Sequence, residues 1–131
     1  MAETPITPKT KTPASSRQAI LAFHFADRIK AEILLASRLL DRVAQMQGLE
    51  GEGASQLFLE FLQGLEMEIN LAQGQLNEPE MVRVSTVMRG LLGMADSRMF
   101  PEMQAHFTWM ISVMATFAQR AMEYLIREKL L

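Results

Sequence analysis

Apolar residues recur at intervals of three and four along most of this chain, a spacing typical of helices that bury one face. The regularity is greatest near the C-terminus, where a single seam alternates steps of four and three. This seam consists of Met103, Phe107, Met110, Met114, Phe117, Ala121 and Tyr124. The sequence carries neither an alternating strand pattern nor an internal repeat of fixed period. We therefore predict an all-α fold.

Capping residues and glycines mark the first two helices. Ser15 and Gln18 have the spacing of a capping box, which predicts a helix from residue 15 to about residue 47. Three glycines within residues 48–53 predict a loop that turns the chain back. A second helix is expected to begin in residues 53–55 and to continue to about residue 76.

Two prolines mark the remaining helices. Pro79 and Pro101 each suit a first helical turn, where the missing N–H has no partner to lose. Four helices joined by short connections predict an up-down bundle over residues 15–131, with the first and fourth helices longer than the middle pair. Residues 1–14 contain three Thr-Pro pairs and cannot build a core, so we predict a disordered, flexible tail there.

Charge is unevenly distributed along the chain. No Lys or Arg lies between Arg42 and Arg83, whereas both flanks are basic. The carboxylates inside this interval are Glu50, Glu52, Glu60, Glu66, Glu68, Glu78 and Glu80. This pattern predicts one acidic helix that is either held against basic neighbours or offered to a basic partner.

Composition limits the classes of protein to which the chain can belong. Hydrophobic residues make up 49% of 131 residues, a surplus that favours a homo-oligomer or a subunit of a larger assembly. The formal net charge of −2 makes nucleic acid an unlikely partner, and the absence of cysteine excludes thiolate metal sites. The longest weakly polar stretch, residues 107–118, is shorter than the roughly 20 residues that span a bilayer. Prolines occupy the place of a signal-peptide core, so a cytoplasmic location is expected.

Few residues suggest catalysis or cofactor binding. Glu102 and His106 lie one helical turn apart, and together with the eleven methionines they leave a metal- or haem-binding bundle as an alternative. The other histidine, His24, lies far away in the first helix. The methionine spacing is also that of a core, and no nucleophile motif or phosphate loop is present. We assign no catalytic residue, no metal ligand and no cofactor.

The sequence therefore predicts a non-catalytic interaction module: a subunit, an adaptor or a helper chaperone. Trp109 falls beside the main seam, where it either fills a second core face or anchors an interface. The small helical subunit of a nucleic-acid complex is a further alternative, with contacts from the basic ends. The partner-binding residues that we predict are Phe107, Trp109, Met110, Met114 and Phe117 for apolar contact, and Glu60, Glu66 and Glu68 for a basic partner.

Overall fold

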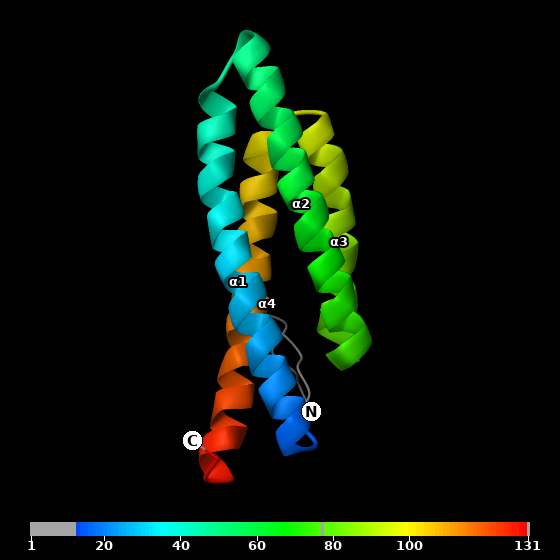
Figure 1. Cartoon of the computed structure of the whole chain (residues 1–131), viewed down its shortest axis with the longest axis vertical. Helices are drawn as coiled ribbons and strands as arrows, with labels where there is room; N and C mark the ends of the chain where they lie inside the picture. Colours follow the sequence, from blue (N-terminus) through cyan, green and yellow to red (C-terminus); the bar gives the residue numbers. More distant parts are fainter. Residues whose placement is uncertain (1–12, 77, 131) are drawn as a thin grey trace, which may run out of the picture.

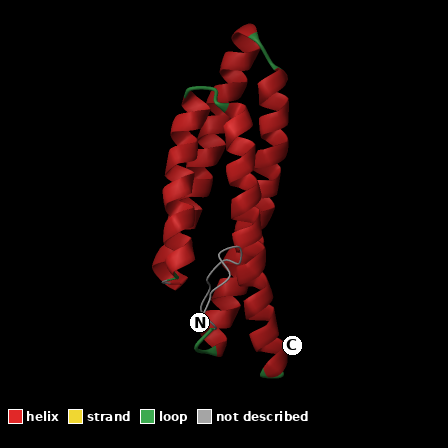
Figure 2. Ribbon diagram, turned by 180° about the vertical axis from the view of Figure 1, so that it is seen from behind, coloured by secondary structure: helices red, strands yellow, loops and turns green. Residues whose placement is uncertain are grey.

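The computed structural model describes residues 13–76 and 78–130. Its four helices are α1 (Ser16–Gln45), α2 (Gly48–Leu76), α3 (Pro79–Asp96) and α4 (Phe100–Arg127). Each helix contacts the next, and α1 also contacts α4, which closes the ring. The helices run alternately up and down, and both ends of the described chain lie at the same end of the bundle (Figures 1 and 2). The all-α up-down bundle is confirmed, whereas the predicted tail falls almost wholly outside the described residues.

The start of α1 follows the sequence pattern in part. The Ser15 hydroxyl accepts a hydrogen bond from the Gln18 backbone N–H at 3.1 Å, as an N-cap residue should. The Gln18 side chain does not complete the capping box. Its Nε2 donates instead to the carbonyl oxygen of Leu76 at 3.0 Å, which satisfies one of the open carbonyls at the end of α2.

The predicted glycine loop is wrong, because α2 already begins at Gly48 and only Met46 and Gln47 separate it from α1. Gly48 has a φ of +65°, a left-handed conformation that lets the chain reverse in so short a link. Gly51 lies so close to the end of α1 that an added Cβ would sit 2.7 Å from the Met46 carbonyl oxygen. The glycines thus build a tight corner between two helices.

Helix lengths differ from the expectation as well. α2 has 29 residues and is nearly as long as α1, whereas α3 has only 18. The corner between α1 and α2 therefore projects beyond the turn between α3 and α4, and α1 and α4 extend past the others at the opposite end (Figure 1). None of the described helices is both long and apolar enough to span a membrane.

The core runs along the middle of the bundle, and all four helices contribute to it. Ile29, Leu65, Met88 and Phe107, one from each helix, are at most 1% exposed. Burial of a side chain of this size contributes roughly 1.5–3 kcal/mol to folding. The apolar periodicity of the sequence thus identifies the inward faces.

The contact between α1 and α4 is the most extensive in the bundle. Gln104 fixes its register with three hydrogen bonds: its Oε1 accepts from the Ser37 hydroxyl at 2.7 Å, and its Nε2 donates to the Ser37 carbonyl at 3.1 Å and to Asp41 Oδ1 at 2.9 Å. Because these partners are far apart in sequence, only the folded bundle brings them together.

Candidate interaction surface

Four of the five apolar residues predicted for partner contact lie inside the bundle. Phe107, Met110 and Met114 are fully buried, and Phe117 is 3% exposed. They form the seam with which α4 packs against the other helices. Their role in partner contact stays a prediction, but in this fold their apolar surface is already used for packing.

Trp109 lies half-buried at the border between α3 and α4. The guanidinium of Arg83 on α3 lies 5.2 Å from the centre of the indole ring, a cation–π distance. The same Arg83 donates from Nη1 to Oε1 of the buried Glu80 at 2.9 Å. Trp109 thus packs against the core beside the α4 seam, and its role at an interface stays a prediction.

The three predicted glutamates do not share one exposed surface. Glu60 is exposed, whereas Glu66 and Glu68 are partly buried. Glu68 pairs with Arg28 of α1, and Arg28 Nε also lies 3.3 Å from Glu32 Oε1. At this point the acidic helix is therefore held against a basic residue of its own bundle.

This cluster changes the acidity of one carboxyl group. Burial, hydrogen bonding to Glu68 and the negative charge of Glu68 raise the pKa of Glu32 to about 7, although Arg28 acts in the opposite direction. Arg28 is close to both carboxyl groups, Glu32 and Glu68, which also lie close to each other. The interaction between α1 and α2 at this point therefore depends on whether Glu32 is protonated.

The pair proposed for metal binding lies in the first turns of α4. Glu102 is exposed and His106 is partly exposed. Within the part of the chain that the structure describes, no three His, Cys, Asp or Glu residues come together closely enough to hold a metal ion.

The outward face of α2 differs from an ordinary solvent-exposed face, which is usually charged. Leu57 and Met67 are each 72% exposed and Leu71 is 57% exposed. Between Gly53 and Gly74 the exposed positions are Gly53, Gln56, Leu57, Glu60, Gln63, Gly64, Met67, Asn70, Leu71 and Gly74. Only Glu60 among them is charged. We call these ten residues the α2 outer face.

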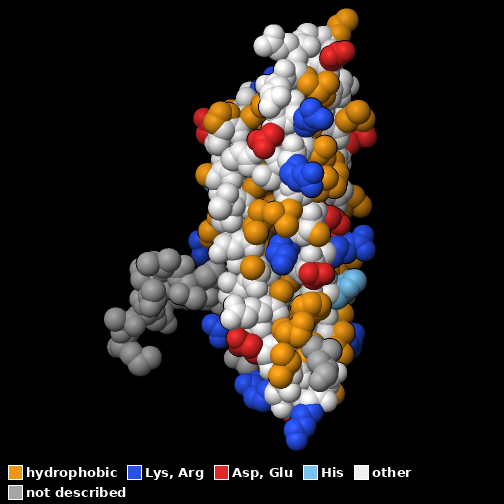
Figure 3. All heavy atoms as spheres, turned by 90° about the vertical axis from the view of Figure 1, so that its left-hand side faces the viewer, with side chains coloured by type: hydrophobic (Ala, Val, Ile, Leu, Met, Phe, Trp, Pro, Cys, Tyr) orange, Lys and Arg blue, Asp and Glu red, His pale blue; other side chains and the backbone are white. Residues whose placement is uncertain are grey.

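The side of the bundle on which α1 lies provides the contrast. Charged side chains of both signs are spread among its hydrophobic groups (Figure 3). The exposed positions of α1 include Asp27, Arg28, Arg38, Asp41 and Arg42. α1 also exposes Ile20, Leu34 and Leu35, but exposed charged residues lie along the same helix, whereas Glu60 is the one charged residue of the α2 outer face.

An apolar groove adjoins the α2 outer face. It has a volume of about 350 Å³ and lies between α1 and α2 near their shared corner. Its walls are Leu39, Arg42, Val43, Met46, Ala54, Leu57, Phe58 and Phe61. Because Leu57 belongs to both the groove and the α2 outer face, the two form one continuous apolar surface.

The chain matches no protein family, no curated protein and no solved structure. The surface of this bundle is therefore the guide to its function.

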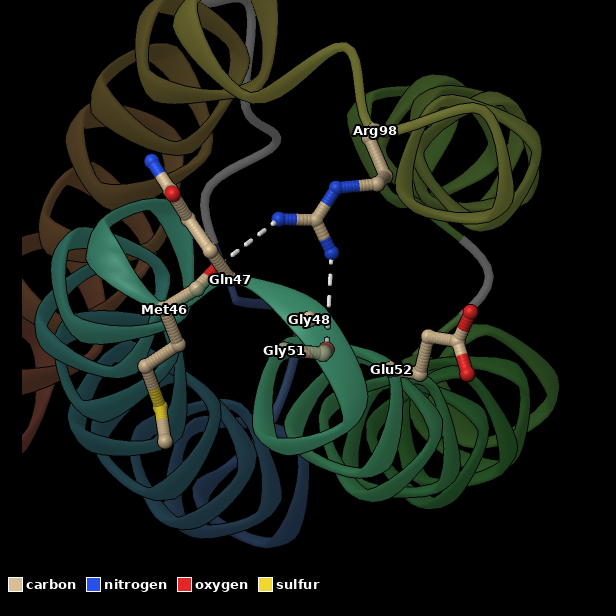
Figure 4. Close-up of a pocket in the computed structure, with 6 residues that line it drawn as sticks. All are labelled: Met46, Gln47, Gly48, Gly51, Glu52 and Arg98. Atoms are coloured by element: carbon tan, nitrogen blue, oxygen red, sulfur yellow. Dashed lines mark hydrogen bonds between the residues drawn. The ribbon is translucent and has the colours of Figure 1, made fainter.

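A second hollow, of about 330 Å³, lies at the corner between α1 and α2 (Figure 4). Arg98, from the turn between α3 and α4, donates from Nη2 to the Met46 carbonyl at 3.3 Å and from Nη1 to the Gly51 carbonyl at 3.5 Å. It also donates to the Ser55 hydroxyl, and its guanidinium lies over the Phe100 ring. Glu52 points away from it (Figure 4). These contacts make Arg98 a structural tie between the two turns.

The sequence carries a signal for the α2 outer face that is recognisable only once the core stripe of the helix is known. Leu57, Gly64, Met67 and Leu71 step by seven, three and four residues, which places them on one side of a helix. A second stripe on the same helix supplies the core, with Leu62, Leu65 and Ile69 among its members. Two apolar stripes on one helix indicate that a neighbour is expected on each side.

Proposed function

We propose that this chain is a non-catalytic helical interaction module that associates through the α2 outer face and the adjoining groove between α1 and α2. The observation that supports this function is the near-absence of charge on the α2 outer face, where one exposed residue in ten is charged. Exposed apolar surface of this continuity is a liability for a monomer and is typical of a contact site.

The groove strengthens the proposal. Its walls are almost entirely apolar, and the one charged side chain among them is Arg42. Such a groove accepts an apolar side chain from a partner, and the flat face beside it accepts a helix. Phe61 and Leu57 lie where the two meet, so a single partner helix can contact both.

The chemistry of the surface favours an apolar partner helix over a basic one. Glu60 is the sole carboxylate on the α2 outer face, and Glu68 already pairs with Arg28. The selection of a basic partner by glutamates is therefore expected to contribute little, and we assign the main contribution to Leu57, Met67 and Leu71.

Site-specific photo-crosslinking in the native cells tests this function. A photoreactive phenylalanine derivative is placed at Met67 and, as the matched control, at Leu34, a 46% exposed apolar residue of α1. We expect adducts of defined mass mainly from position 67. Equal yields from the two positions, or no adduct from position 67, would contradict the proposal.

A further inference from the structure

Two leucines and the two end glycines of the α2 outer face are spaced almost evenly about its middle. Gly64 is at the centre, Leu57 and Leu71 lie seven residues to either side, and Gly53 and Gly74 close the two ends. Nothing in the described part of the chain lies within 4 Å of a Cβ built on any of these three glycines. The bundle itself therefore does not use the space above them.

In a two-fold symmetric interface the same patch of each copy packs against the other, so that residue i meets residue j and residue j meets residue i. We propose that the α2 outer face binds a second copy of this chain, with the two α2 helices antiparallel about an axis near Gly64. This inference rests on the proposed function and names its partner. Leu57 then meets Leu71 of the second copy, and the glycines allow the two backbones to approach closely.

Charge favours the antiparallel direction. In a parallel pair, Glu60 would face its own copy directly across the interface. In the antiparallel pair, Glu60 lies beside Met67 of the second copy. Each Glu60 is four residues from the two-fold axis, so the two Glu60 positions are about 12 Å apart along the helix axis at 1.5 Å per residue. That distance exceeds the screening length of about 8 Å at physiological salt, so their repulsion is weak.

The residues beside the apolar stripe fit the same register. Gln56 and Gln63 lie along one edge of the α2 outer face and carry no charge. In the antiparallel pair, Gln63 faces Gln63 of the second copy, and amide groups both donate and accept hydrogen bonds. Glu68, on the other edge, is already paired with Arg28. The interface therefore brings no unneutralised like charges into contact.

The expected area indicates a weak dimer. The stretch from Gly53 to Gly74 is about 33 Å long at 1.5 Å per residue, and with a helix width of about 10 Å each copy contributes about 330 Å². The total of about 700 Å² is below the roughly 1,200 Å² of a stable interface. Contact of Leu71 with the groove beside Leu57 adds to this area. We expect association that increases with protein concentration.

Disulfide trapping tests the arrangement, because the chain contains no cysteine. Gly64→Cys places one thiol beside the axis. Gly90→Cys is the matched control, since Gly90 is also an exposed helical glycine with open space around it. Under mild oxidation we expect about tenfold more covalent dimer from Gly64→Cys, because associated thiols react at a high effective concentration. Circular dichroism confirms that both variants retain the helical fold.

A second pair of variants reports the direction. In the antiparallel pair, Leu57→Cys and Leu71→Cys cross-link to each other when mixed, and each alone forms little disulfide. Self-linked Leu57→Cys would indicate a parallel pair and overturn the proposal. Equal trapping of Gly64→Cys and Gly90→Cys would also overturn it. If disulfide trapping fails and photo-crosslinking at position 67 yields a different polypeptide, the proposed function stands but self-association is wrong. If photo-crosslinking at position 67 yields nothing, both the proposed function and self-association are wrong.

Discussion

Replacement of Phe107 by alanine distinguishes a core residue from a contact residue. Its side chain is fully buried, and Phe→Ala in a core costs about 3–5 kcal/mol of unfolding free energy. Met103 and Met110, one turn to either side on α4, are flexible enough to relax into the cavity, so we expect the lower end, about 3 kcal/mol. At about 2.1 cal/mol/K of unfolding entropy per residue, a chain of this length loses about 4 °C per kcal/mol, or about 12 °C in all.

Thermal and urea unfolding followed by circular dichroism measure this loss. The control is Leu57→Ala, because Leu57 is 72% exposed and its truncation is expected to change the unfolding free energy by less than about 0.5 kcal/mol. The comparison is made at low protein concentration, where association contributes least. An unchanged melting temperature for Phe107→Ala, together with loss of association, would refute its placement in the core.

Three further changes test the corner and the carboxylate cluster. Gly51→Ala is expected to lower the unfolding free energy by about 1–3 kcal/mol, because the added Cβ would lie 2.7 Å from the Met46 carbonyl oxygen. A melting temperature above that of the native chain would contradict this close approach. Arg98→Ala, measured in urea, is expected to lose about 0.5–1.5 kcal/mol, because the exposed Arg98 ties two turns together by hydrogen bonds for which water can substitute. Arg98→Lys is expected to restore only part of that loss, and a full restoration would contradict this role. Glu32 has a pKa of about 7 in the folded chain against an ordinary 4.5, so the native state binds more protons and stability falls as pH rises between these values. Glu32→Gln is expected to remove this pH dependence. In the native chain the free energy of unfolding is expected to fall by about 1 kcal/mol from pH 5 to pH 8, a value reduced to allow for solvent contact of the Glu32 side chain. If Glu32→Gln has the same pH profile as the native chain, the raised pKa of Glu32 is disproved.

Much of the fold was predictable from local patterns. Ser15, Pro79 and Pro101 mark helix starts to within a residue or two, because capping and the missing proline N–H act over a single turn. The inward faces follow from apolar spacing. The seam through Phe107 is buried from Met103 to Ala121, whereas Tyr124 at its end is partly exposed. Where the prediction failed, at residues 48–53, the three glycines were taken as a loop, whereas these residues form the first turns of α2 beside a sharp corner.

The candidate surface was much less predictable. The sequence placed Phe107 and Met110 on an apolar seam, but the same pattern suits a core and an interface equally. It identified α2 as acidic without showing that Arg28 lies across from Glu68. Such pairings depend on which helices become neighbours, and residues 40 positions apart carry no local signal of that.

The sequence by itself determined four helices, most of their boundaries and the stripes along which each is apolar, because these depend on spacing within one helix. The tertiary structure decided which stripes are covered. α2 carries one stripe through Leu65 and another through Met67, and the ring of contacts with α1 and α3 buries the first and exposes the second. Burial depends on the neighbours that a face acquires, and those neighbours are fixed only when the whole chain has packed.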